Sequence, residues 1–338
     1  MAKNHIGVEE LRSDEANLIA SQFASKRSNS SGAVRGAAAK PASVFRWGSW
    51  TDVPRANCAS LILVRGKPAL VMWWEPDKFN SECLQVTQAR LHWILSYPKT
   101  INSTDLPGLS SALSRILHQS EWDLVALRLF GHEPTAADLF QRAGFRLVVG
   151  NAWLYRWPIK SVGFETIPKG VSFDVRGLKE NPLPDDALHE YLEVATESIF
   201  ADRFSLDLNL DEVLVRQRFL STIENGLRGD IADYAVTARS KTGIEAFAFF
   251  VVKKSLESNS YPQAGKWLTL IARSSQRAQG IAHFVIAEAI RRLPEGKANW
   301  MCSCALDNFA SLRTAQKMGF QMGAIVYDMH RWRANPGT

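Results

Sequence analysis

The run Arg277-Ala278-Gln279-Gly280-Ile281-Ala282 has the residue types and spacing of a loop that binds a diphosphate. It follows the apolar run Trp267–Ala272, which predicts a strand, and it opens a run up to Leu293 with helical spacing. A loop at a helix N-terminus presents unpaired main-chain N–H groups, and the helix dipole adds roughly half a positive charge there. Gly280 has no Cβ, so the backbone can approach a ligand closely. Each hydrogen bond to a charged group contributes about 1.5–3 kcal/mol, so a few such amides would hold a diphosphate without a metal.

The segment that follows predicts another strand and another helix in a fixed order. Ala298–Cys304 is strand-like, and after it come Asp307-Asn308-Phe309-Ala310-Ser311-Leu312-Arg313 and Lys317-Met318-Gly319-Phe320. With the pattern Arg-x-x-Gly-x-Ala before it, this order resembles the GNAT superfamily of N-acyltransferases. In that superfamily a Gln/Arg-x-x-Gly-x-Gly/Ala loop binds acyl-CoA and Asn-x-x-Ala and Lys-x-Gly-Phe segments follow; Ser311 takes the small-residue position. The resemblance implies the GNAT fold, an α/β architecture with helices on both faces of a mixed sheet.

The resemblance also implies the ligands. Acetyl-CoA is the expected cosubstrate, a small primary amine is the expected acceptor, and no metal is expected. The main-chain amides of Leu270, Ile271 and Ala272 would serve the pantetheine arm and the oxyanion. Asn308 would cap its helix and also face the CoA arm.

The chain shows an internal repeat. Three segments of the first half match three segments of the second: Leu124–Leu129, Glu133–Ala136 and Gly144-Phe145 correspond to Trp300–Cys304, Asn308–Ser311 and Gly319-Phe320. The separation from Glu133 to Gly144 equals that from Asn308 to Gly319. The first copy lacks the loop, because nothing in Tyr97–Asp105 matches Arg-x-x-Gly-x-Ala. We therefore expect two tandem GNAT-like domains, a degenerate one over 44–160 and an acyl-CoA-binding one over 165–335. A flexible segment over 1–43, rich in Ser, Ala, Gly, Lys and Arg from 21 to 43, precedes them.

Periodicity predicts the remaining elements. In the first copy we expect strands over 59–64, 69–74, 88–94 and 124–129, helices over 109–118 and 134–142, a turn at 65–68, and a hairpin over 145–157 turned at Gly150-Asn151. In the second we expect a strand over 171–176, helices over 186–200 and 210–226, and strands over 234–238 and 246–252 before Trp267. Residues 255–265 read as an irregular polar loop. The resulting order β-α-α-β-β-β-α-β-α-β is that of the GNAT fold.

The residues that would transfer protons depart from the family pattern. In many family members a tyrosine four residues before the Gly of Gly-Phe is the general acid, and here that position is Ala315, with Phe140 in the first copy. Tyr327 is a replacement candidate for the acid, or else a packed sheet tyrosine. Asp307 is a candidate base, or else a helix cap, and His283 reads more readily as a surface or core histidine. General acid catalysis contributes about 10²–10⁴-fold, and proximity contributes more, so transfer can persist without the tyrosine.

Further segments resemble the TDP-fucosamine acetyltransferase type, whose members have a degenerate N-terminal GNAT-like domain. Asp77–Leu84 resembles an Asp-Ser-Glu-Phe-Phe-Gly motif, Ala201–Asp207 an Arg-Phe-x-x-Asp segment, and Tyr327–Trp332 an aromatic C-terminal strand. This resemblance implies acetylation of the 4-amino group of a nucleotide-linked deoxysugar. Asp202, Arg203 and Asp207 either contact such an acceptor or only shape the connection between two helices.

Composition limits the class of protein. The 338 residues, 46% hydrophobic and 22% charged, suit a soluble protein of two domains. No apolar run reaches the ~18–20 residues that span a bilayer, and Met1–Asp14 lacks the apolar core of a signal peptide. Four cysteines do not predict a disulfide framework, and Cys302 and Cys304 on one strand face predict core packing rather than a metal site. We expect a cytoplasmic protein with no membrane partner.

The net charge of +6 suits an anionic ligand such as CoA or a nucleotide sugar. No basic stripe interleaved with aromatic residues occurs, so no nucleic-acid partner is expected, and a homodimer is a possible assembly. The leading hypothesis is an acyl-CoA-dependent N-acyltransferase. One alternative is a non-catalytic module that binds acyl-CoA or a partner protein, which Ala315 favours. Another is a tandem aminoacyl transferase that uses charged tRNA, which the intact Arg277–Ala282 loop disfavours.

Overall fold

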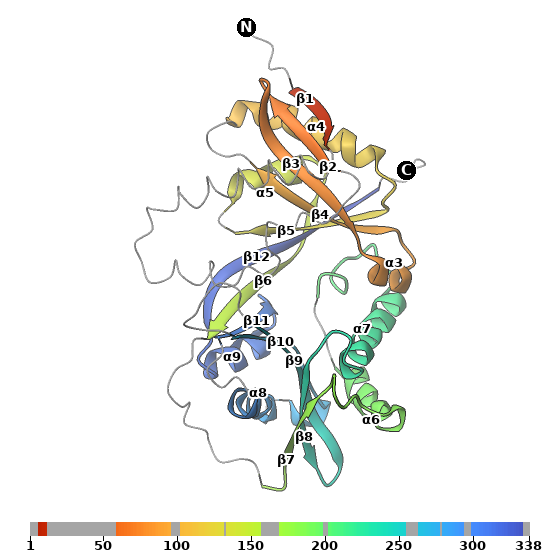
Figure 1. Cartoon of the computed structure of the whole chain (residues 1–338), viewed down its shortest axis with the longest axis vertical. Coiled ribbons are helices and arrows are strands. Elements are labelled where there is room, and N and C mark those ends of the chain that lie inside the picture. The colour runs from red at the N-terminus through yellow and green to blue at the C-terminus, as the bar shows by residue number, and fades with distance from the viewer. Residues whose placement is uncertain are drawn as a thin grey trace. The chain divides into compact units, whose positions relative to one another are not determined.

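The chain forms two compact units that do not follow the order of the sequence. The computed structural model describes residues 6–11, 59–95, 102–131, 133–156, 169–198, 202–254, 263–277, 279–293 and 299–333 (Figure 1). Unit 1 comprises Met1–Val149 and Val326–Thr338, and unit 2 comprises Gly150–Ile325. Of the predicted flexible segment 1–43, only residues 6–11 are described, and they form a strand. Most of the predicted loop over 255–265 lies outside the described residues.

Unit 1 is a sheet with the helices α4 (Leu106–Gln119) and α5 (Pro134–Arg142) packed on one face. Its elements are β1 (Ile6–Leu11), β2 (Ala59–Val64), β3 (Lys67–Pro76), α3 (Lys78–Leu84), β4 (Gln88–Leu95), the 3-10 turn η1 (Ser103–Asp105), α4 (Leu106–Gln119), β5 (Leu124–Phe130), α5 (Pro134–Arg142) and the end of β12 (Gln321–Trp332). The strand order is β1-β2-β3-β4-β5-β12, antiparallel except for the parallel pair β4–β5. The strands and helices predicted for the first copy before residue 145 are confirmed. The turn between β2 and β3 lies at Arg65 and Gly66, whose φ values of 54° and 71° match a two-residue hairpin turn.

Unit 2 has helices on both faces of its sheet. Its elements are β6 (Arg146–Arg156, from residue 150), β7 (Ser172–Gly177), α6 (Asp185–Thr196), α7 (Glu212–Leu227), β8 (Tyr234–Ser240), β9 (Gly243–Lys254), β10 (Gln263–Ala272), the 3-10 turn η2 (Ser274–Gln276), α8 (Ile281–Arg292), β11 (Asn299–Ala305) and α9 (Phe309–Lys317), followed by β12. The strand order is β6-β11-β10-β9-β8-β7, with β10–β11 as the parallel pair. The predicted order of elements is confirmed, although α6 ends at Thr196 and β10 begins at Gln263, inside the predicted loop, because Gln263–Lys266 pair with β9.

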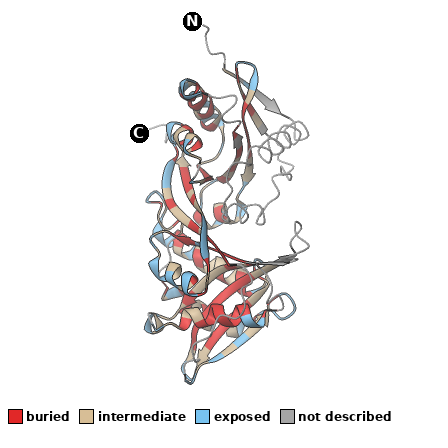
Figure 2. Cartoon of the chain, turned by 90° about the vertical axis from the view of Figure 1, so that its left-hand side faces the viewer, coloured by how far each residue is buried: buried red, intermediate tan, exposed pale blue. Residues whose placement is uncertain are grey.

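Alternation along the strands separates the hydrophobic cores, which Figure 2 shows as buried strand and helix faces. In β9, Ala246, Ala248 and Phe250 belong to a cluster covered by α8 and α9, whereas Phe247 and Phe249 belong to a cluster covered by α6 and α7. In unit 1, a third cluster forms between the sheet and the buried faces of α4 and α5. Alternate side chains of β9 are therefore buried on opposite faces of the sheet of unit 2.

The two copies exchange their last strands. The predicted hairpin over 145–157 is wrong, because Arg146–Arg156 is one continuous strand. From Asn151 to Arg156 it pairs antiparallel with Ala305–Trp300 of β11, a strand of the second copy. In return, Val326–Trp332 of β12 pair antiparallel with Phe130–Leu124 of β5 in the first copy. A distant partner strand satisfies the backbone through Gly150-Asn151, so these turn-forming residues form no turn.

Two arginines occupy matching places in the exchanged strands. Arg156 of β6 donates from Nε to the carbonyl oxygen of Met318, at the end of α9, over 2.8 Å. Arg331 of β12 donates from Nε to the carbonyl oxygen of Ala143, at the end of α5, over 3.1 Å. The separation along the chain between Arg156 and Arg331 equals that between Ala143 and Met318, the residues whose carbonyls they bind. Each carbonyl-bearing residue directly precedes the glycine of a Gly-Phe pair. The internal repeat read from the sequence is therefore also a repeat of contacts.

Candidate functional site

The strand β10 leaves one of its edges open near the predicted loop. It pairs with β9 along its whole length, but it pairs with β11 only from Ala264 to Lys266. Gly265 permits this close contact, since a Cβ there would lie 2.5 Å from the ring of Trp300. Beyond Lys266 the two strands pair no further, so the β11-facing edge of residues 267–272 has no strand partner among the described residues. Leu270, Ile271 and Ala272, whose main chain we predicted to contact the pantetheine arm, lie on this segment.

A β-bulge between Trp267 and Thr269 reverses which side chains face each core. Trp267 packs in the cluster under α8 and α9, and Leu268 packs on the opposite cluster. After the bulge, Leu270 and Ala272 pack on the α8 side and Ile271 on the other. Simple alternation from Trp267 would give the opposite assignment. The bulge thus turns the strand where its pairing with β11 ends.

The predicted phosphate loop ends at the N-terminus of α8. Gly280 is the residue before the helix and has φ 81°, in the left-handed region that favours glycine. Two loop amides close turns within the loop: Arg277 N donates to Ser274 O at 3.3 Å, and Gln279 N donates to Gln276 O at 3.2 Å. The amides of Gly280, Ile281 and Ala282 donate to no other described residue. Ala278 lies outside the described residues.

Glu197, at the end of α6, ties the loop to the second helical layer. Its carboxylate accepts from Ser274 N at 2.9 Å and Ser274 Oγ at 2.8 Å, and it pairs with Arg273 Nη1 at 3.0 Å. The hydrogen bonds from the main chain and hydroxyl of Ser274 lower the pKa of the Glu197 carboxyl. Arg277 donates from Nη2 to the main-chain carbonyl of Glu197. Sequence reasoning missed Glu197, because no local pattern links it to a loop far along the chain.

Asn308 and Asp307 lie between β11 and α9. Asn308 caps α9, since its side-chain oxygen accepts from Ser311 N at 3.1 Å, which confirms the predicted cap. Asp307 is exposed, and its main-chain carbonyl accepts from Phe309 N at 3.0 Å. The capping alternative for the Asp307 side chain is therefore wrong. The side chain remains available for another role.

Solved structures of similar fold are GNAT proteins. A GCN5-related N-acetyltransferase from Sphaerobacter thermophilus has 14% identity and a TM-score of 0.57, over 98% of this chain and 97% of that chain. A tandem GNAT protein from the clavulanic acid biosynthesis pathway has 12% identity and a TM-score of 0.55, over 98% of this chain and 99% of that chain. No protein-family model and no curated protein matches the sequence. The chain has the GNAT fold.

The positions at which we expected a general acid from the sequence resemblance are buried in both copies. Ala315 is 0% exposed and packs in the cluster under α8 and α9. Phe140 in the first copy is also 0% exposed, and its ring makes edge contacts with Trp93 and Phe145. Tyr327 is partly buried and packs against the hydrophobic cluster of unit 1, whereas Asp307 belongs to unit 2. The structure does not bring together the two predicted catalytic residues within one unit.

The motifs that suggested an amino-sugar enzyme make local structural contacts. Asp77 caps α3, accepting from Asn80 N at 3.3 Å. Asp202 accepts from the amides of Phe204 and Ser205, each at 2.9 Å, and pairs with Arg218 at 2.5 Å. The guanidinium carbons of Arg203 and Arg218 lie 4.6 and 4.2 Å from the centre of the Phe204 ring. These contacts hold the connection between α6 and α7.

The cysteine pair lies in the core of the GNAT fold, as predicted. Cys302 and Cys304 are buried in the cluster under α8 and α9, and burial raises the pKa of the Cys302 thiol. In the described ranges, no group of three or more His, Cys, Asp and Glu side chains is placed to hold a metal ion. Among the helices that the structure describes, none combines the length and apolar character needed to cross a bilayer.

Proposed function

We propose that this chain transfers an acyl group, acetyl in the first instance, from acyl-CoA to the primary amine of a small molecule. One observation supports the proposal most directly. The amides of Gly280, Ile281 and Ala282 have no partner among the described residues, and they lie at the N-terminus of α8 beside the open edge of β10. Main-chain donors at a helix N-terminus suit a diphosphate.

The loop fits the diphosphate of CoA in geometry and in charge. A Cβ at position 280 would lie 3.4 Å from the side chain of His283, and glycine leaves this space open. Arg273 and Arg277 add positive charge next to the loop, and the Glu197 carboxylate balances only one of them. Arg277 would steady the loop through the Glu197 carbonyl and attract the diphosphate by its charge. This arrangement needs no metal ion.

The open edge of β10 would hold the pantetheine arm. The amide groups of pantetheine can form hydrogen bonds with the main chain of Leu270–Ala272, as a neighbouring strand would. A main-chain N–H on the same segment would stabilise the oxyanion that forms on the thioester carbonyl. The ladder with β11 ends at Lys266, next to the bulge, which would leave this edge to a ligand backbone rather than to a strand.

The transfer joins the amine nitrogen to the thioester carbonyl carbon and breaks the carbon–sulfur bond. The sulfur leaves as a thiolate and takes a proton, while the nitrogen loses one. We assign proton acceptance to the exposed carboxylate of Asp307, which belongs to the same unit as the loop before α8. Neither Ala315 nor Phe140 can donate a proton. Orientation of the two substrates, with an effective molarity of about 10⁵–10⁸ M, would supply most of the acceleration.

A nucleotide-linked amino sugar is the acceptor class that we favour. The net charge of +6 suits an anionic acceptor as well as CoA. The segments that resemble the TDP-fucosamine type also favour this class of acceptor. Within these segments, Asp77 caps a helix and Asp202 pairs with Arg218, so these two side chains have structural roles. A panel of amino sugars, amino acids and polyamines in an acetyl-CoA thiol-release assay would identify the acceptor.

A second candidate function is binding of acyl-CoA without catalysis. The burial of Ala315 favours it, because no acid occupies that place in either copy. Thiol release that depends on an added amine would exclude this second candidate. CoA binding without thiol release across the whole panel would establish it.

The decisive experiment removes one loop amide without changing a side-chain charge. Ala282→Pro deletes an N–H in the first turn of α8, where proline is tolerated, and Ala282→Ser keeps that N–H. We expect Ala282→Pro to weaken CoA binding about 10- to 150-fold, the value of one hydrogen bond to a charged group, and Ala282→Ser to leave it nearly unchanged. Titration calorimetry with CoA measures both. Equal affinities in the two variants, or no CoA binding by the parent chain, would contradict the proposed function.

A further inference from the structure

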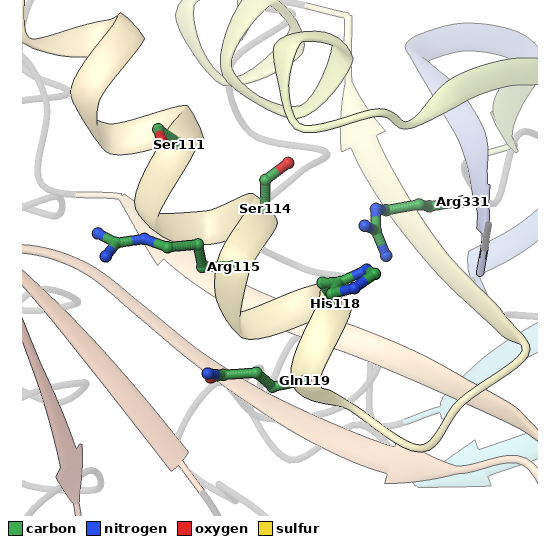
Figure 3. A pocket seen from close by; sticks show the side chains of 6 residues that line it. All are labelled: Ser111, Ser114, Arg115, His118, Gln119 and Arg331. Carbon is green, nitrogen blue, oxygen red and sulfur yellow. The ribbon is translucent and has the colours of Figure 1, made fainter. Parts of the chain in front are cut away.

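Unit 1 contains an open hollow of ≈ 360 Å³, lined by residues with polar side chains, that the acyl-transfer proposal does not use. It is lined by Ser111, Ser114, Arg115, His118 and Gln119 from α4 and by Arg331 from β12 (Figure 3). Two of the six side chains are guanidiniums, one is an imidazole, and none is a carboxylate. The volume is at the lower end of the range for small-molecule sites, about 300–1,000 Å³.

Arg331 is a charged group with no anionic partner among the described residues. Its Nε donates to the carbonyl oxygen of Ala143, and Ser114 Oγ donates to the same carbonyl at 3.3 Å. In the described part of the chain no carboxylate pairs with its guanidinium. Burial lowers the pKa of Arg331, because the protonated form loses hydration that a neutral carbonyl replaces only in part. An oxyanion in the hollow would supply the missing charge.

The equivalent surface of unit 2 has the opposite character. Helices α4 and α8 begin at matching places in the two copies. Counted from those starts, Ser111, Ser114, Arg115 and His118 correspond to Ile286, Ala289, Ile290 and Leu293. The four residues of the α8 side are buried in the hydrophobic core, whereas Ser111, Arg115 and His118 of the α4 side are exposed. The first copy therefore presents polar and cationic groups where the second packs against its own sheet.

The side chains are arranged for a ligand with one charged end. Figure 3 shows the Arg331 guanidinium directed toward His118 and Ser114, while Arg115 and Gln119 project from the other flank of α4. The Nη atoms of a guanidinium offer donors that match phosphate, and an imidazole adds a further hydrogen bond. The nearer end of α4 is its C-terminus, whose dipole disfavours anions, so the side chains would have to provide the binding energy.

We infer that this hollow in unit 1 binds the phosphate group of a small phosphate ester, held by Arg331 and His118, with Ser114 fixing the Ala143 carbonyl that positions Arg331. Arg115 and Gln119 contact the remainder of the ligand. The site belongs to the copy that lacks the acyl-CoA loop, and it does not depend on the loop before α8. It gives the degenerate copy a ligand of its own.

Calorimetric titration of the full chain at constant ionic strength tests the site. The probes are inorganic phosphate, adenosine 5′-monophosphate as a phosphate ester, and citrate as a carboxylate. We expect saturable binding of both phosphate compounds, tighter for the ester, and much weaker binding of citrate. Absence of saturable phosphate binding, or citrate binding as tight as the ester, would overturn the inference.

Variants locate the binding. Ser114→Ala with His118→Leu introduces the residues of α8, and we expect it to weaken binding of the ester at least about tenfold. His118→Leu alone changes an exposed side chain, so it should fold even if the double variant does not, and it should also weaken binding. Arg142→Ala, an exposed residue of α5 paired with Asp138, is the matched control and should bind as the parent does. Loss of phosphate binding in Ala282→Pro with no loss in His118→Leu would assign the phosphate to the α8 loop and refute this site.

Discussion

At the residue scale, two small residues decide what the second copy can do. Gly280 has a φ of 81° that favours glycine, and this conformation ends the loop beside three amides without partners among the described residues. Ala315, at the position where the sequence resemblance leads us to expect a general acid, is completely buried. Binding of the cosubstrate and chemistry at the sulfur are therefore separate questions in this chain.

Replacing Ala315 by tyrosine should destabilise the protein rather than restore an acid. The added ring would enter a filled core, and overpacking of this kind costs typically about 1–3 kcal/mol. Ala310→Tyr places the same side chain on an exposed position of the same helix and should leave stability nearly unchanged. Thermal unfolding and thiol release measure the two effects. An Ala315→Tyr variant that is as stable as the parent and faster in thiol release would show that the position does open to the thioester.

The residues of the loop could be predicted from the sequence, but the contacts that hold the loop could not. Glycine at position 280 and the cap at Asn308 follow from local rules, and the structure shows both geometries. Glu197 is distant in sequence from Ser274, and only the folded chain brings them together. The burial of Ala315 likewise depends on how α9 packs, which spacing alone does not reveal.

At the element scale, the site depends on where strands stop pairing. The period of Trp267–Ala272 predicts a strand correctly, but an unbroken apolar run gives no sign of the bulge after Trp267. The end of the β10–β11 ladder at Lys266 is equally invisible in the sequence. Helix α6 is predicted too long: it ends at Thr196, and Glu197, its C-cap, places its carboxylate on the loop.

The bonds from the Glu197 carboxylate to Ser274 and Arg273 should make the free energy of unfolding depend on pH in the acid range. The pKa of Glu197 in the folded protein lies below its usual value of 4.5, so its contribution is fully present above about pH 4.5 and is lost as the pH falls through the folded-state pKa. Glu197→Gln removes that contribution, so the gap in melting temperature between parent and variant should be largest near neutral pH and should shrink in acid. Glu193→Gln, an exposed change on the same helix, is the control. A gap that stays constant from neutral to acid pH would contradict the assignment.

At the scale of the whole molecule, the exchanged strands make each compact unit depend on both halves of the sequence. The repeat itself is readable, because Gly144-Phe145 and Gly319-Phe320 recur at the same place in each copy. The exchange is not readable, because β6 and β12 hold equivalent places and their sequences do not specify which copy each one joins. Local turn chemistry at Gly150-Asn151 even favours a hairpin that the distant partner β11 overrides.

This architecture predicts which fragments of the chain fold. A fragment over 165–338 contains the whole second repeat but lacks β6, so the edge of β11 from Trp300 to Ala305 loses its partner strand and Trp300 and Cys302 lose cover. A fragment over 144–326, of similar length, retains β6 and follows the limits of unit 2. We expect cooperative thermal unfolding and stabilisation by CoA for 144–326, and aggregation or non-cooperative unfolding for 165–338. Co-expression of 1–160 with 165–338 should restore a folded complex, because each fragment then receives the strand that it lacks. Cooperative, CoA-stabilised unfolding of 165–338 alone would show that the second repeat does not need the strand from the first.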